Sequence, residues 1–129
     1  MRIYRGANEG ITEQCAGSFY TEHYDLALVY SEMEEKPKVY AYNIELKLIN
    51  IKDTEEGSID EGIICITDDE LNNYDGYTDE SGIQICLFGR LSNDCDVNSL
   101  NDNTKAIFKK LSIAELRQDA ILDYRRYDR

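Results

Sequence analysis

Two short stretches of this 129-residue sequence carry side chains that could do chemistry on a small molecule. Tyr4-Arg5-Gly6 lies at the end of a short predicted first strand. An Arg guanidinium binds phosphate or ribose, and a Gly lets the backbone approach a ligand closely. Asp79-Glu80-Ser81-Gly82 supplies adjacent carboxylates, which stabilise developing positive charge or accept a proton. The plainer interpretations are a strand end with an exposed Arg and a polar turn.

The elements that would position the first stretch are predicted from apolar spacing. Ile3-Tyr4 opens a short strand closed by Gly6, residues 7–16 form a loop, and Gly17–Thr21 forms a second strand. Thr21 is expected to cap a following helix, because its hydroxyl accepts free backbone N–H groups. The inner face of that helix is expected to carry apolar residues at helical spacing, namely Leu26, Val29, Tyr30 and Met33.

Later segments complete an α+β pattern. Val39–Ile51 alternates as a half-buried strand does, with apolar Tyr40, Tyr42, Ile44, Leu46 and Leu48 on one side. Two more strands are expected at Ile63–Ile66 and Ile83–Phe88. Ser112 and Glu115 form a capping box for a helix whose apolar face carries Ile113, Leu116, Ala120, Ile121 and Tyr124. The order of elements predicts a single α+β domain over 1–129, with a core at about 2–90 and a helical segment at about 104–127.

Composition excludes several function classes. The chain has 14 basic and 26 acidic residues, a net charge of −12, so a broad basic face for nucleic acid is not expected. Its start lacks an apolar signal region and no stretch is long enough to span a bilayer, so a cytoplasmic monomer without membrane contact is expected. With one histidine and four widely spaced cysteines, free thiols and no metal site are expected.

Charge is unevenly distributed along the chain. Residues 53–80 carry eleven Asp or Glu residues and no Lys or Arg. Such a run is most simply a solvated face. The alternative is a surface that attracts a basic partner, because opposite charge raises the rate of association.

The order of the motifs resembles the ADP-ribosyltransferase family. Arg5-Gly6 is similar to the turn that ends the family's first strand, Gly17–Thr21 to the aromatic strand that follows, and Tyr30 to a Tyr of the next helix. Asp79-Glu80-Ser81-Gly82 resembles an acid-bearing turn in small phage-encoded members, which include an anti-CRISPR enzyme. The resemblance spans roughly residues 2–90. It implies a compact fold of split mixed and antiparallel sheets with flanking helices, NAD as cosubstrate and no metal.

The resemblance also implies roles for individual residues. Phe19 and Tyr30 would sandwich the nicotinamide ring, Arg5 would hold ribose or phosphate, and the backbone of Gly6 would bind the carboxamide. The matching stretches add further candidates for binding NAD: Tyr4, Tyr20 and Thr21. The family's usual catalytic Glu falls at Gln84, which cannot carry negative charge, so Asp79 or Glu80 would take over that role, with Asp79 matching the phage relative.

Three functions compete at this point. The first is NAD-dependent mono-ADP-ribosyl transfer to a protein target, such as a CRISPR effector complex or another nucleic-acid-binding protein. The second is a protein of the same fold without catalysis, which uses its acidic surface to occlude a nucleic-acid-binding partner. The third is an NAD glycohydrolase toxin, in which water replaces the acceptor. Gln84 favours the second function, and the retained Arg5, Phe19 and Tyr30 favour the first.

Overall fold

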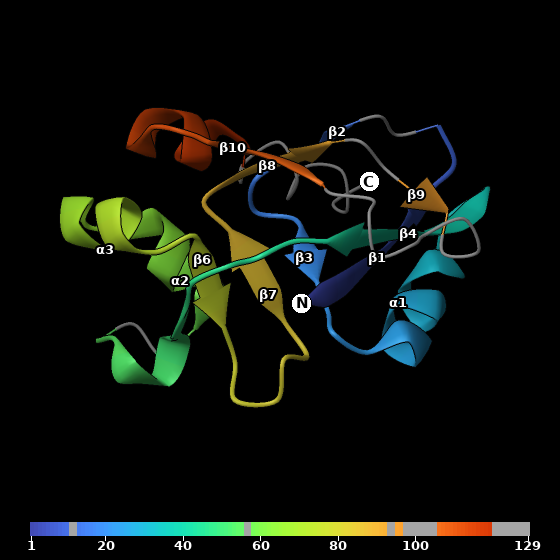
Figure 1. Ribbon diagram of the computed structural model, residues 1–129, viewed down its shortest axis with the longest axis horizontal. Coiled ribbons are helices and arrows are strands. Elements are labelled where there is room, and N and C mark those ends of the chain that lie inside the picture. The colour runs from blue at the N-terminus through green and yellow to red at the C-terminus, as the bar shows by residue number, and fades with distance from the viewer. Residues whose placement is uncertain (11–12, 56–57, 93–94, 97–105, 120–129) are drawn as a thin grey trace.

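The computed structural model describes residues 1–10, 13–55, 58–92, 95–96 and 106–119. Within these residues the chain forms three small sheets, with helices at two ends of the molecule (Figure 1). Helix α1 (Tyr24–Ser31) packs on β1 and β4, while α2 (Ile59–Ile64) and α3 (Asp68–Asn73) lie toward the opposite end, near β6. The predicted α+β class is confirmed.

The first sheet has the order β1-β4-β9 and is antiparallel (Arg2–Asn8, Pro37–Asn43 and Cys95–Asp96). Gly6 was predicted to close this strand, but it lies within β1, opposite Val39. A Cβ at Gly6 would overlap the carbonyl oxygen of Ala27. The glycine is therefore required because helix α1 approaches the strand so closely.

Helix α1 turns a different face inward from the one predicted. Its buried residues are the small Ala27 and Ser31, whereas Val29, Tyr30 and Met33 are exposed. Only small side chains fit between the helix and Gly6, so apolar spacing gave the wrong inner face. The N-cap residue is His23 rather than Thr21, although the Thr21 hydroxyl does accept the His23 N–H at 3.1 Å.

The second sheet has the order β3-β7-β6-β5 (Phe19–Tyr20, Ile85–Leu87, Gly76–Thr78 and Leu48–Asn50), and only its β5–β6 pair is parallel. Strand β7 is buried on both faces: Cys86 belongs to one apolar cluster, and Ile85 and Leu87 belong to another. This two-sided burial explains the continuous apolar run in the sequence. Strand β3 is shorter than the predicted Gly17–Thr21, and β7 is shorter than Ile83–Phe88.

The single long strand predicted for Val39–Ile51 is wrong. The chain leaves the first sheet after Asn43, starts β5 at Leu48 and continues as the short helix η1 (Ile51–Asp53). Residues 39–43 are all buried, because β4 is covered on both faces. Residues on both faces of β4 are therefore buried, whereas the strand prediction assumed one buried and one exposed face.

The strand predicted for Ile63–Ile66 is also wrong, because the first half of this apolar run is the end of α2 and the second half follows the helix. Ile59 and Ile63 are buried one helical turn apart, and the Tyr77 hydroxyl donates to the Gly62 carbonyl oxygen at 3.2 Å. Cys65, expected in a buried strand, is exposed on the turn after the helix. A short apolar run does not distinguish a buried strand from a buried helix.

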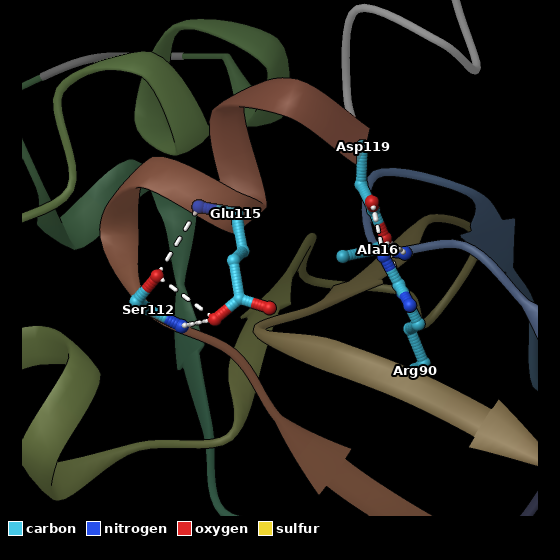
Figure 2. Close-up of polar contacts among 5 residues, drawn as sticks. All are labelled: Ala16, Arg90, Ser112, Glu115 and Asp119. Atoms are coloured by element: carbon cyan, nitrogen blue, oxygen red, sulfur yellow. Dashed lines mark hydrogen bonds and ion pairs between the residues drawn. The ribbon is translucent and has the colours of Figure 1, made fainter.

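The third sheet has the order β10-β8-β2 (Ile107–Lys110, Gly89–Ser92 and Glu13–Gln14), so part of the predicted 7–16 loop is strand. A helix follows at 113–119, and its capping box is confirmed: Ser112 Oγ accepts the Glu115 N–H at 3.2 Å (Figure 2). Leu116 is buried on its inner face. The other predicted inner residues, Ala120, Ile121 and Tyr124, lie outside the described residues.

An ion pair between the half-buried Arg90 and the buried Asp119 ties this helix to the sheets. Arg90 donates two hydrogen bonds of 2.8 Å to the Asp119 carboxylate, which also accepts the Ala16 N–H at 3.1 Å (Figure 2). Burial alone would raise the pKa of Asp119, but the hydrogen bonds from Arg90 and Ala16 outweigh it and lower the pKa below the ordinary 3.8. We call these three residues the Asp119 clasp.

Candidate functional site

Strands β1 and β3 meet at a bridge between Tyr4 and Thr21. The Tyr4 N–H donates to the Thr21 carbonyl oxygen at 2.8 Å, and the Thr21 N–H donates back at 2.9 Å. Because backbone polar groups alternate along a strand, the N–H and C=O of Gly6 point to the same edge of β1 as those of Tyr4. Gly6 therefore turns its backbone toward β3 at the level of Phe19.

Arg5 lies at this junction as a buried residue, with 4% of its surface exposed. Its Nε donates to Gln14 Oε1 at 2.7 Å, and its Nη1 donates to the Phe19 carbonyl oxygen at 3.1 Å. The plainer expectation of an exposed Arg at a strand end is therefore wrong. In this arrangement the guanidinium ties β1 to β2 and β3.

The aromatic candidates are not gathered in one place. Phe19 is half-buried against the cluster that contains Tyr77 and Phe88. Tyr20 is a core residue, with its ring edge-on to Tyr42 at a centroid distance of 5.8 Å.

Tyr30 lies on α1, the helix against which Gly6 packs. Adjacent strand residues point to opposite faces, so the Arg5 side chain lies on the other side of β1 from Tyr30. The structure thus brings Arg5 together with Phe19 but separates it from Tyr30.

The Asp79 carboxylate organises the turn between β6 and β7. Its Oδ1 accepts the N–H groups of Ser81 and Ile83 at 3.2 and 2.9 Å, and its Oδ2 accepts that of Gln84 at 3.3 Å. Gly82 adopts a φ of +67°, which side-chain-bearing residues rarely do. Most of the accepting capacity of Asp79 is therefore directed at its own turn.

The turn faces two ways. On the β5 side, the exposed Glu80 forms an ion pair with Lys52. On the β3 side, the Thr21 hydroxyl donates to the Gly82 carbonyl oxygen at 3.3 Å, and the His23 Nε2 lies 2.8 Å from the Ser81 carbonyl oxygen. Glu80 accordingly points away from the junction of β1 and β3.

Strand register places Gln84 next to the junction. Tyr20 pairs with Ile85, so one residue further along Thr21 comes opposite Gln84. Asp79 continues β6, the next strand over, about 10 Å from Thr21 at ordinary strand spacing. On the strand that faces β3, the position opposite Thr21 is therefore held by an amide and not by a carboxylate.

Glu22 is a carboxylate at this site that sequence reasoning missed. Its N–H donates to the Gly82 carbonyl oxygen at 3.0 Å, and its carboxylate occupies the place where a Cβ of Gly82 would lie. The available signal was the polar run Thr21-Glu22-His23 between a strand and a helix. Nothing local in the sequence linked that run to a turn 60 residues later.

The acidic segment 53–80 is partly explained by helix α3. Asp68, Asp69 and Glu70 occupy its first turn, where carboxylates are favoured, and Thr67 and Glu70 form a reciprocal capping box. This local role supports the interpretation of the run as a solvated face. Among the side chains that the structure describes, no three His, Cys, Asp or Glu residues are grouped as a metal ion requires.

Comparison with known proteins adds no relative. No family model, no curated protein and no solved structure matches this chain. Over the described parts of the chain, no helix has the length and apolar character that crossing a bilayer requires. The described residues form an α+β fold with a polar junction between two sheets, at which Tyr4, Gly6, Thr21, Glu22 and Gln84 lie.

Proposed function

We propose that the chain is an NAD-dependent mono-ADP-ribosyltransferase that modifies a protein target. One observation carries the proposal: motifs far apart in the sequence meet at one junction. The Arg5-Gly6 strand, Thr21 and the Asp79–Gln84 turn are joined there by hydrogen bonds from Thr21 to Tyr4 and to Gly82. A compact site assembled from three distant motifs is what a shared ligand requires.

The backbone edge of β1 supports binding of the nicotinamide end of NAD. The N–H and C=O of Gly6 offer one donor and one acceptor at this edge, matching the two polar groups of a carboxamide. Arg5 is buried and bonded to Gln14 and Phe19, so its proposed role is to hold β3 beside that edge. Thr21 and Gln84 would then lie beside the ribose.

The reaction needs a negative charge near the ribose. The bond from ribose C1′ to nicotinamide breaks, its electron pair leaves with nicotinamide, and the acceptor nucleophile attacks C1′ and loses a proton. Gln84 cannot stabilise the resulting cation by charge. Glu22 is the proposed carboxylate because it lies next to Thr21, and Asp79 remains the alternative on the adjacent strand.

Labelled NAD tests the proposal. The protein is incubated with NAD and a host lysate, transfer is measured as labelled protein, and NAD affinity is measured separately by calorimetry. Glu22→Gln is expected to lower transfer at least about tenfold while NAD still binds, because charge matters most in the transition state. Glu55→Gln, an exposed glutamate after η1, is the matched control. Wild-type protein that binds no NAD would overturn the proposal.

A binding protein without catalysis is the second candidate. Two observations favour it: Gln84 occupies the position opposite Thr21, and Asp79 directs its carboxylate at three backbone N–H groups of its own turn. The same experiment separates the candidates. Labelled protein indicates a transferase, free ADP-ribose without labelled protein indicates a glycohydrolase, and the absence of NAD binding indicates a binding protein.

A further inference from the structure

Helix α1 and the residue pair after it expose an unusual concentration of large apolar side chains. Among the described residues, eight large hydrophobic side chains are exposed, and five of them fall within residues 24–33, with 37% to 72% of their surface exposed. We call these five the α1 surface: Tyr24, Leu28, Val29, Tyr30 and Met33. Single exposed apolar residues need no explanation, but several on one short segment give it the apolar surface that interaction sites have.

The packing of α1 accounts for this exposure. The helix contacts β1 through Ala27 and Ser31, which lie directly against Gly6. Because the backbones approach so closely, there is no room for a large side chain between them. The larger side chains are therefore directed outward or to the two flanks of the helix. Tyr24 lies on one flank, where its ring packs edge-on against Tyr4, and Tyr30 lies on the other.

The α1 surface is also strongly acidic. Residues 22–35 contain five Asp or Glu residues and no Lys or Arg. Asp25 and Glu32 are both exposed and seven positions apart, so they share one face of the helix, and Leu28 and Val29 lie between them. Carboxylates thus alternate with apolar side chains across the outward face.

We propose that the α1 surface docks against an arginine-bearing surface of another protein. A guanidinium pairs with a carboxylate through two hydrogen bonds, and its planar face stacks on Tyr rings. Its aliphatic stem packs on apolar side chains such as Leu28 and Val29. A purely apolar groove would bury Asp25 and Glu32 without partners, which is costly.

Charge excludes other occupants. Nucleic acid and anionic lipid surfaces carry negative charge and would be repelled by this segment. The proposed partner surface is basic, as the surfaces of nucleic-acid-binding proteins are. The inference does not depend on NAD chemistry, because a transferase that modifies a protein and a protein that occludes one both need a docking surface.

Nuclear magnetic resonance with two probe peptides tests the proposal. Nona-arginine and nona-lysine peptides of equal charge are titrated into ¹⁵N-labelled protein, and backbone amide shifts are mapped along the chain. The largest shifts are expected in residues 24–33, with arginine binding about fivefold tighter than lysine, because a guanidinium stacks on whichever Tyr ring, Tyr24 or Tyr30, borders the flank of the helix that it contacts. Shifts centred on the acidic α3 instead would indicate unspecific attraction and overturn the proposal.

Matched variants separate surface chemistry from charge alone. Val29→Ser with Met33→Ser is expected to weaken binding of the arginine peptide, whereas Ile107→Ser, also an exposed apolar residue, leaves it unchanged. Asp25→Asn with Glu32→Gln should weaken it more than Asp68→Asn with Asp69→Asn in α3. Unchanged affinity in the variant with Val29→Ser and Met33→Ser would overturn the proposal. A wild-type dimer that dissociates in sedimentation when Val29→Ser is introduced would also overturn it, because a second copy of the chain would then be the occupant.

Discussion

Asp79 and Gln84 are joined to each other twice. The Asp79 N–H donates to the Gln84 carbonyl oxygen at 3.2 Å, and the Gln84 N–H donates to the Asp79 carboxylate at 3.3 Å. Asp79 was predicted to be catalytic and Gln84 to occupy the position of the family's catalytic Glu, yet the bonds between them close the turn that joins β6 and β7. Their first role in this fold is to fix the position of Gly82 beside Thr21.

Replacing Asp79 should therefore destabilise the fold. Asp79→Ala removes the acceptor of three backbone N–H groups and is expected to lower the free energy of unfolding by about 1–2 kcal/mol, the scale for losing a helix-capping side chain or a buried hydrogen bond. Urea unfolding at neutral pH measures the change. The control is Glu80→Ala, whose exposed ion pair with Lys52 should contribute less than about 1 kcal/mol. Equal effects of the two variants would contradict the assigned role of Asp79.

Gly6→Ala should detach helix α1. The added methyl group would overlap the Ala27 carbonyl oxygen, so strand and helix must move apart, at a cost of about 2–3 kcal/mol. Relative to wild type, the variant should show faster amide hydrogen exchange in residues 24–31, with little change in β7. Gly10→Ala is the comparison, because Gly10 has a positive φ but open space around it. If Gly6→Ala loses no more stability than Gly10→Ala, the close approach of α1 does not explain the glycine at position 6.

The Asp119 clasp predicts a pH dependence of stability. The pKa of Asp119 in the folded protein lies below 3.8, the ordinary value. The contribution of Asp119 to the free energy of unfolding is therefore complete above pH 3.8, and it is lost as the pH falls toward the pKa of the folded protein. Asp119→Asn should lower the free energy of unfolding by about 2 kcal/mol at pH 7, since it removes charged hydrogen bonds. The difference from wild type should shrink below pH 4. A difference that stays constant down to pH 3 would exclude the clasp as its source.

Phe19→Ala and Tyr30→Ala separate packing from NAD binding. Phe19 packs on the core, so its removal should cost about 2 kcal/mol of stability, whereas exposed Tyr30 should change stability by less than about 0.5 kcal/mol. Under the predicted nicotinamide sandwich, Tyr30→Ala would still weaken NAD binding by about 1–3 kcal/mol. Calorimetry measures the NAD affinity of the folded Tyr30→Ala variant. An unchanged affinity would show that Tyr30 does not contact NAD.

Some local signals in the sequence predicted local structure correctly. The Ser112–Glu115 capping box depends on residues three positions apart, and it forms as expected. The apolar run around Ile85 does form a strand, and its alternate side chains pack into apolar clusters on the two faces of the sheet. The prediction for the inner face of α1 was wrong because that face is determined by a residue elsewhere in the chain, Gly6, which packs closely against the helix.

The candidate site shows the same limit. The sequence identified Arg5, Thr21 and the Asp79 turn individually, and the fold brings these segments together through Tyr4 and Gly82. It did not identify Glu22, whose proximity to Gly82 depends on strand pairing across 60 residues. Nor could it reveal that Arg5 is buried, because its bonds to Gln14 and Phe19 depend on how three strands meet.

The contact between Asp119 and the Ala16 N–H has a consequence for how the molecule assembles. These residues are 103 positions apart in the sequence, so their contact closes a very long loop. Such contacts form late, since the entropy lost in closing a loop grows with its length and slow folding accompanies distant pairings. During synthesis, the β1–β4 pair and α1 can form before residue 119 exists. The Ala16 N–H therefore lacks its carboxylate acceptor until residue 119 has been synthesised.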